Sequence, residues 1–107
     1  MTSKPIVLRV IAEGDIEEAA AYYADTAGES VAIRFAEALD AAYRVVASRP
    51  AIGSSLLAHD LGLAGLRSRK LKRFPYLVIY IERDDHIDVW RVIHAQRDIP
   101  GWLHEDD

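Results

Sequence analysis

The chain has 107 residues, of which 50% are hydrophobic and 28% are charged, so we expect one globular domain over residues 1–107. The absence of cysteine excludes disulfides, a thiolate nucleophile and cysteine-based zinc sites, and it fits a cytoplasmic protein. The net charge is −4, whereas proteins that bind phosphate groups usually carry an excess of basic residues. No apolar run approaches the roughly 20 residues that span a bilayer, so we expect no membrane contact.

The first half of the chain predicts a strand followed by two helices. Residues 6–11 are β-branched and almost continuously apolar, which indicates a short strand. Asp15 and Glu18 have the spacing of a capping box, so we expect a helix to begin there and to end at Gly28. An apolar stripe predicts a second helix over residues 29–48. The short connection predicts that the two helices form an antiparallel hairpin.

The second half predicts an irregular segment and three strands. Residues 54–65 lack a clear period, whereas residues 66–71, 76–83 and 87–94 are typical of strands. Short connections favour an antiparallel meander. The order β-α-α-β-β-β therefore predicts an α+β fold, with the helical hairpin on one face of a small, mostly antiparallel sheet and the other face open. Residues 96–102 are expected to leave the sheet.

Charge is distributed unevenly along the chain. Residues 13–40 hold eight anions against Arg34 alone, whereas residues 61–80 hold five cations and no anion. Charged side chains on an edge strand prevent pairing between molecules, but five cations exceed that need. We therefore interpret the cluster as a binding surface, which consists of Arg67, Arg69, Lys70, Lys72 and Arg73.

His94 stands at the end of the last predicted strand. A lone histidine there is usually structural, and a general base needs a second group to position the substrate. Arg91, Gln96 and Arg97 supply no second acid–base group, and Tyr76 fits a core position equally well. The remaining histidines are not spaced as metal ligands, so we expect no metal and no cofactor; they are His59, His86 and His104.

Several segments, in their order and spacing, resemble toxins of the RelE/ParE superfamily from bacterial toxin–antitoxin pairs. They are the early helix 15–23, VASRPAIG at 46–53, LKRFPYLVIY at 71–80 and RVIHAQRD at 91–98. The chain is most similar to the ParE branch. That resemblance implies a toxin of a type II toxin–antitoxin system that is not an enzyme, inhibits DNA gyrase and blocks replication.

The resemblance also implies partners and the residues that contact them. A ParD-like antitoxin is expected to bind the basic cluster together with Tyr80 and Arg91, and operator DNA is expected to be bound only through that antitoxin. Arg97 and Trp102 are expected to contact gyrase. The acidic antitoxin segments of this superfamily fit a basic surface, because opposite charge steers association.

Two alternatives remain open at this point. A RelE-like ribosome-dependent mRNA endonuclease would use His94, Arg97 and Arg73. The acidic net charge opposes this alternative, as does Trp102, which stands roughly where a RelE-type toxin carries its tyrosine. A plain protein-interaction module with the same fold is the other alternative, and arrested growth on expression would separate it from both toxin hypotheses.

Overall fold

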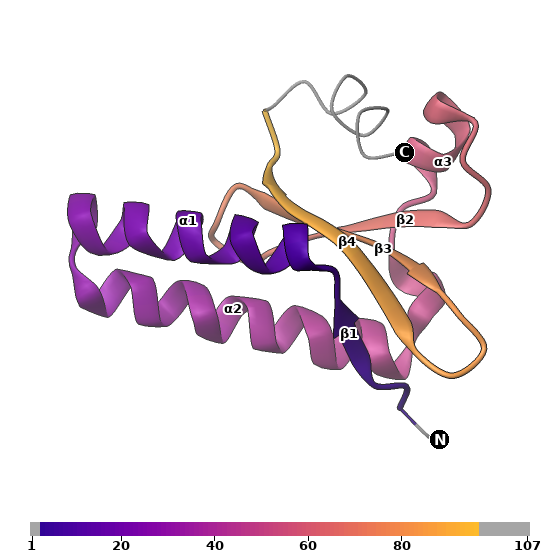
Figure 1. Cartoon of the computed structure of the whole chain (residues 1–107), viewed down its shortest axis with the longest axis horizontal. Coiled ribbons are helices and arrows are strands. Elements are labelled where there is room, and N and C mark those ends of the chain that lie inside the picture. The colour runs from indigo at the N-terminus through magenta and orange to yellow at the C-terminus, as the bar shows by residue number, and fades with distance from the viewer. Residues whose placement is uncertain (1–2, 97–107) are drawn as a thin grey trace.

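The computed structural model describes residues 3–96 (Figure 1). Two long helices lie side by side and extend to the left of a twisted sheet, and a short helix lies at the upper right. In chain order, the elements are β1 (Ile6–Leu8), α1 (Val10–Ala27), α2 (Glu29–Ser48), the 3-10 turn η1 (Pro50–Ile52), α3 (Leu56–Leu61), β2 (Leu66–Lys70), β3 (Tyr76–Glu82) and β4 (Ile87–His94).

The sheet has four strands in the order β1-β4-β3-β2. β2, β3 and β4 form the predicted antiparallel meander, and β1 joins β4 in parallel. The α1–α2 hairpin packs on one face, where Phe35 and Val78 are fully buried in the main core. The predicted α+β class, element order and hairpin are therefore confirmed.

The first helix begins earlier than the capping pattern predicts. Strand β1 ends at Leu8, and α1 starts at Val10, so Asp15 lies within the helix instead of capping it. Arg9, in extended conformation, donates its backbone N–H to the Val89 carbonyl oxygen at 3.0 Å, which completes the β1–β4 pairing. The helix can begin directly afterwards, because nothing in its first turn prevents helical backbone angles.

The second face of the sheet is covered in part, so the prediction of an open face is wrong. Helix α3 and the loop after it cover the β2 end of this face. Both lie in residues 54–65, the segment that was predicted to be irregular. A second hydrophobic cluster results, in which Leu66, Ile79 and Ile93 have no exposed surface. Leu57 and Leu61 of α3 pack against it. Burying these leucines outweighs the weak local helix signal of a six-residue segment.

Tyr80 holds the segment that follows α2, residues 49–53, against the sheet; we call this segment the α2 exit. Its hydroxyl donates to the Pro50 carbonyl oxygen at 2.6 Å and accepts the Gly53 N–H at 3.0 Å. A Cβ atom at position 53 would collide with this hydroxyl, so the close approach requires glycine. Burial raises the pKa of Tyr80 and keeps the phenol neutral. These contacts set where the chain turns toward β2 and its cations.

Candidate partner-binding surface and the His94 cleft

The basic surface is formed by β2, an edge strand of the sheet, and by the loop that follows it. Arg67 and Arg69 are half-buried, while the other three cations are exposed. Arg67 donates to the Gly53 carbonyl oxygen at 2.8 Å, so it also holds the α2 exit in place. We use "basic surface" for Arg67, Arg69, Lys70, Lys72 and Arg73.

Three cations of the basic surface border a shallow groove against α2. The groove has a volume of about 100 Å³, and its helix side consists of three alanines and Val45. Alanine lets the strand approach the helix closely, which leaves an apolar floor beside charged side chains. Within residues 3–96, none of these three cations forms an ion pair, so their charge is available to a partner; they are Arg69, Lys70 and Lys72.

Arg73 reaches the surface from a strained turn between β2 and β3. Its φ of 68° lies in the left-handed region, which is unfavourable for a residue with a Cβ atom. The turn is closed by a hydrogen bond from the Leu71 N–H to the Tyr76 carbonyl oxygen at 3.0 Å. The β2–β3 connection therefore projects Arg73 into solvent.

Two residues predicted to bind an antitoxin are buried. Tyr80 has no exposed surface, and its hydroxyl is used by the α2 exit. Arg91 is 9% exposed and forms two hydrogen bonds with the Asp15 carboxylate, at 2.8 and 2.9 Å. Alternation along the strands did not reveal this burial, because α1 and the α2 exit cover these two positions. Neither side chain has the exposed surface that the predicted contact needs.

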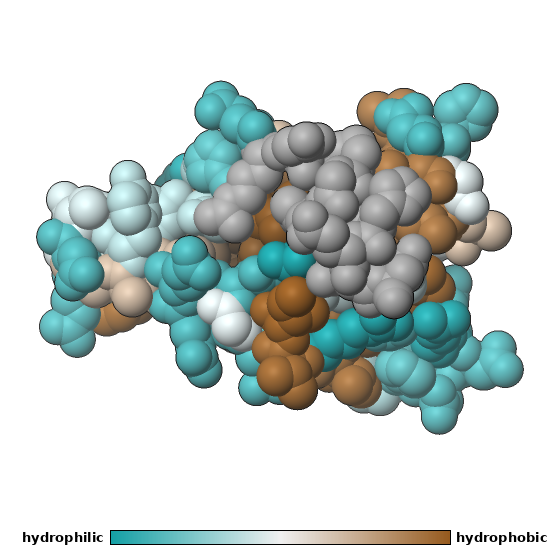
Figure 2. Space-filling view, turned by 45° about the horizontal axis from the view of Figure 1, so that its top comes forward, coloured by the Kyte–Doolittle hydropathy of each residue, from teal (hydrophilic) through white to brown (hydrophobic). Residues whose placement is uncertain are grey.

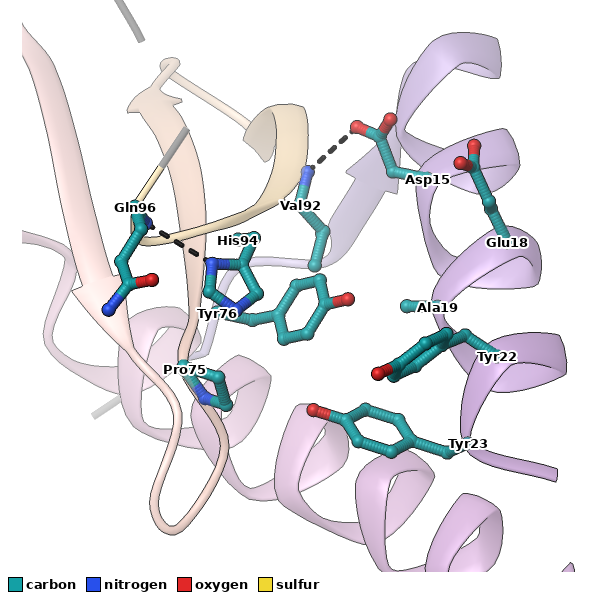
Figure 3. Close-up of a pocket in the computed structure, with 10 residues that line it drawn as sticks. All are labelled: Asp15, Glu18, Ala19, Tyr22, Tyr23, Pro75, Tyr76, Val92, His94 and Gln96. Carbon is teal, nitrogen blue, oxygen red and sulfur yellow. Dashed lines mark hydrogen bonds between the residues drawn. The ribbon is translucent and has the colours of Figure 1, made fainter. Parts of the chain in front are cut away.

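His94 lies beside a cleft between α1 and the ends of β3 and β4. The cleft has a volume of about 550 Å³. Figure 3 shows carboxylates, tyrosine rings and His94 around it, with the α1 side chains opposite the strand ends. The lining within residues 3–96 is Asp15, Glu18, Ala19, Tyr22, Tyr23, Pro75, Tyr76, Val92, His94 and Gln96. The sequence alone does not reveal this cleft, since α1 and β4 are distant in the chain.

The position of the His94 ring is set by two neighbours. The Gln96 N–H donates to its Nδ1 atom at 3.2 Å, which places the proton of a neutral imidazole on Nε2. The Tyr76 ring stands edge-on to it, with centroids 5.4 Å apart. No lysine or arginine lines the cleft within residues 3–96. Arg91 compensates the Asp15 carboxylate, so a phosphate there would meet the Glu18 carboxylate, which forms no ion pair in the same range. Arg97 and Trp102 lie outside the described residues.

Comparison with protein-family models matches nearly the whole chain. The model described as "ParE toxin of type II toxin-antitoxin system, parDE" matches residues 6–99. The chain belongs to this ParE toxin family. The resemblance predicted from the sequence is confirmed, because the match includes the helical hairpin and every strand of the sheet.

A solved structure from P. aeruginosa, described as "Chromosomal ParDE TA system from P. aeruginosa", has the same fold as this ParE-family chain. The TM-score is 0.72 at 14% sequence identity, and the alignment covers 88% of this chain and 98% of that one. At this identity the likeness concerns the fold alone. The comparison with curated proteins found no significant match.

A charge cluster that sequence patterns did not reveal surrounds Asp88 in this ParE-family chain. Arg9 and Arg83 both bind its carboxylate, with closest distances of 3.0 Å, and the Trp90 indole N–H donates at 3.3 Å. Arg9 also stacks 4.3 Å from the Trp90 ring centre. Burial opposes the charge of Asp88, but the arginine hydrogen bonds outweigh it and hold the pKa of Asp88 below its usual value. This cluster joins β1 to the β3–β4 hairpin.

Within residues 3–96, no three metal-binding side chains come together. No helix in the same range has the length and apolar character needed to cross a bilayer. Two surfaces within residues 3–96 have features that suit a partner, namely the basic surface and the cleft beside His94.

Proposed function

We propose that this ParE-family toxin inhibits DNA gyrase, and that it does so by binding and not by catalysis. The match to the ParE toxin family over residues 6–99 carries this proposal. Inhibition by binding also agrees with the chemistry of the His94 cleft. Within residues 3–96 its lining holds the unpaired carboxylate of Glu18 and no lysine or arginine, which does not suit the phosphate groups of an RNA substrate.

We further propose that a ParD-like antitoxin neutralises the toxin by binding along the basic surface. The similarity in fold to a chain of the P. aeruginosa ParDE system supports a partner of this kind. An extended acidic segment would place carboxylates near Lys70 and Lys72 and apolar side chains over the alanines of the α2 groove. Tyr80 and Arg91 are left out of this surface because they are buried. Operator DNA would be contacted through the antitoxin.

Arg97 and Trp102 remain predicted gyrase contacts. They lie beyond the described residues but within the same C-terminal segment. Replacing both with alanine should relieve growth arrest without changing the thermal melting temperature. Full toxicity of a folded double variant would remove this segment from the proposed mechanism.

The decisive experiment compares the two toxin activities with the same purified protein. We expect loss of supercoiling and accumulation of cleaved DNA when gyrase is added, and no codon-dependent mRNA cleavage on translating ribosomes. The ribonuclease alternative rests on His94, which lies beside a phenol at the cleft. mRNA cleavage that disappears in His94→Ala, with gyrase unaffected, would replace the gyrase proposal by that alternative.

A further inference from the structure

The cleft beside His94 has a chemical character that neither the antitoxin proposal nor the gyrase proposal uses. Its lining within residues 3–96 contains two carboxylates and four aromatic rings, and no lysine or arginine. A hollow of this composition repels anions and attracts a cation that can also stack on aromatic rings.

The two carboxylates of the cleft differ in how far their charge is compensated. Asp15 forms two hydrogen bonds with the Arg91 guanidinium and accepts the Val92 N–H at 3.1 Å. Glu18 lies three residues further along α1, is exposed and forms no ion pair within residues 3–96. In Figure 3 the two carboxylates lie near each other, at the same end of the cleft. Among the described residues, the uncompensated negative charge of the cleft is therefore that of Glu18.

The aromatic rings form a continuous row from solvent to His94. Tyr22 is 59% exposed and stands edge-on to Tyr23, with ring centroids 5.5 Å apart. Tyr23 contacts Tyr76 at 6.2 Å, and Tyr76 contacts His94 at 5.4 Å. Burial and the neighbouring phenols raise the pKa of Tyr23, so its hydroxyl stays protonated. Because Tyr22 is so exposed, its ring offers a face that packing within the fold does not occupy.

We propose that this cleft binds the side chain of an arginine presented by a protein partner. A planar guanidinium stacks on tyrosine, while its five N–H groups can donate to the Glu18 carboxylate and to phenol oxygens. The volume of about 550 Å³ lies in the range of sites that enclose small molecules, so it admits the side chain together with flanking backbone. The proposal does not depend on whether gyrase is the target.

The test uses the full-length chain and two short peptides. Acetyl-Gly-Arg-Gly-amide is titrated against the same peptide with citrulline, which replaces the guanidinium by a neutral urea of nearly the same shape. Resonances of Tyr22, Tyr23 and His94 are followed by NMR. We expect saturable shifts with the arginine peptide in the millimolar range, and binding at least about tenfold weaker with the citrulline peptide.

Variants at exposed positions separate specific binding from general attraction to an acidic helix. Glu18→Gln and Tyr22→Ala should each weaken the arginine peptide by about threefold to fivefold, because each removes one surface-type interaction. The matched controls are Glu17→Gln on α1 and Ile33→Ala on α2, which do not line the cleft and should leave binding unchanged.

Three results would overturn the proposal. The first is equal affinity for the arginine and citrulline peptides, and the second is an absence of saturable shifts up to about 50 mM arginine peptide at low salt. The third is equal weakening by Glu17→Gln and Glu18→Gln, which would indicate diffuse attraction to α1. The gyrase and mRNA assays are independent of all three.

Discussion

The groove between β2 and α2 and the cleft beside His94 are two hollows formed by residues 3–96, and they have opposite chemistry. The groove between β2 and α2 is small, with an alanine floor and cations that lack ion pairs within the described residues. The cleft between α1 and the strand ends is about five times larger, and carboxylates and tyrosine rings line it. The net charge of −4 hides this contrast, because it averages over both sites. One small domain can therefore offer a basic surface to an acidic partner and an acidic cleft to a basic partner.

The two hollows also depend on different structural supports. An ion pair between α1 and β4 borders the acidic cleft, whereas a tyrosine hydroxyl fixes the α2 exit beside the basic surface. Figure 2 shows apolar residues next to hydrophilic ones on the part of this face that is coloured. If the supports are separate, damage to one hollow should leave the other intact. The following changes test that separation.

The largest loss of stability is expected from Arg91→Ala. The side chains of Arg91 and Asp15 are 11% and 9% exposed, so the variant leaves a buried carboxylate without its cation. We expect the free energy of unfolding to fall by about 3–5 kcal/mol, measured by urea denaturation. The matched control is Arg44→Ala, which breaks an exposed 3.8 Å pair with Asp40 and should change stability little. Equal stability of both variants would contradict the structural role of the buried pair.

Tyr80→Phe should have the next largest effect. The variant removes one hydroxyl and leaves the Gly53 N–H and the Pro50 carbonyl without their partner. We expect a loss of about 1–3 kcal/mol, together with faster hydrogen exchange at the Gly53 amide. Tyr22→Phe is the control, since Tyr22 is exposed. If the Gly53 amide stays protected, the hydroxyl does not fix the α2 exit.

Charge reversal on the basic surface tests the proposed antitoxin contact. Lys70→Glu with Lys72→Glu should slow association with a ParD-like antitoxin by about tenfold at low salt and flatten its salt dependence. Stopped-flow measurements at several ionic strengths give both quantities. Arg34→Glu is the control, because Arg34 is exposed on α2 but lines neither hollow. If the control slowed association equally, the effect would come from the net charge of the protein and not from the basic surface.

The smallest expected effect concerns pH and lies outside both hollows. The pKa of Asp88 is lower in the folded chain than its ordinary value of 3.8. Its contribution to stability is therefore complete above that value and disappears as the pH falls through the lower folded pKa. Asp88→Asn should remove this part of the acid dependence in denaturation measured at several pH values. An unchanged acid slope would contradict a stabilising role for the Arg9 and Arg83 contacts.

Local patterns in the sequence were enough to predict most of the fold. The second helix and the last strand have the predicted bounds, 29–48 and 87–94, because each has a clear apolar period and a distinct stop. Short connections determined the hairpin and the meander. The basic cluster was also visible directly, since charge is a property of the residues themselves. Family resemblance required only the order and spacing of these segments.

Contacts between distant segments decided the rest. Asp15 looked like a helix cap, but Arg91 binds it across 76 positions of the chain. Tyr80 was predicted to belong to a binding surface, but in the fold the α2 exit covers it. Helix α3 exists because its leucines complete the second core, and the cleft beside His94 exists only where α1 meets the strand ends. Local periodicity specifies which side of an element is apolar, but burial and charge pairing depend on what packs against that side.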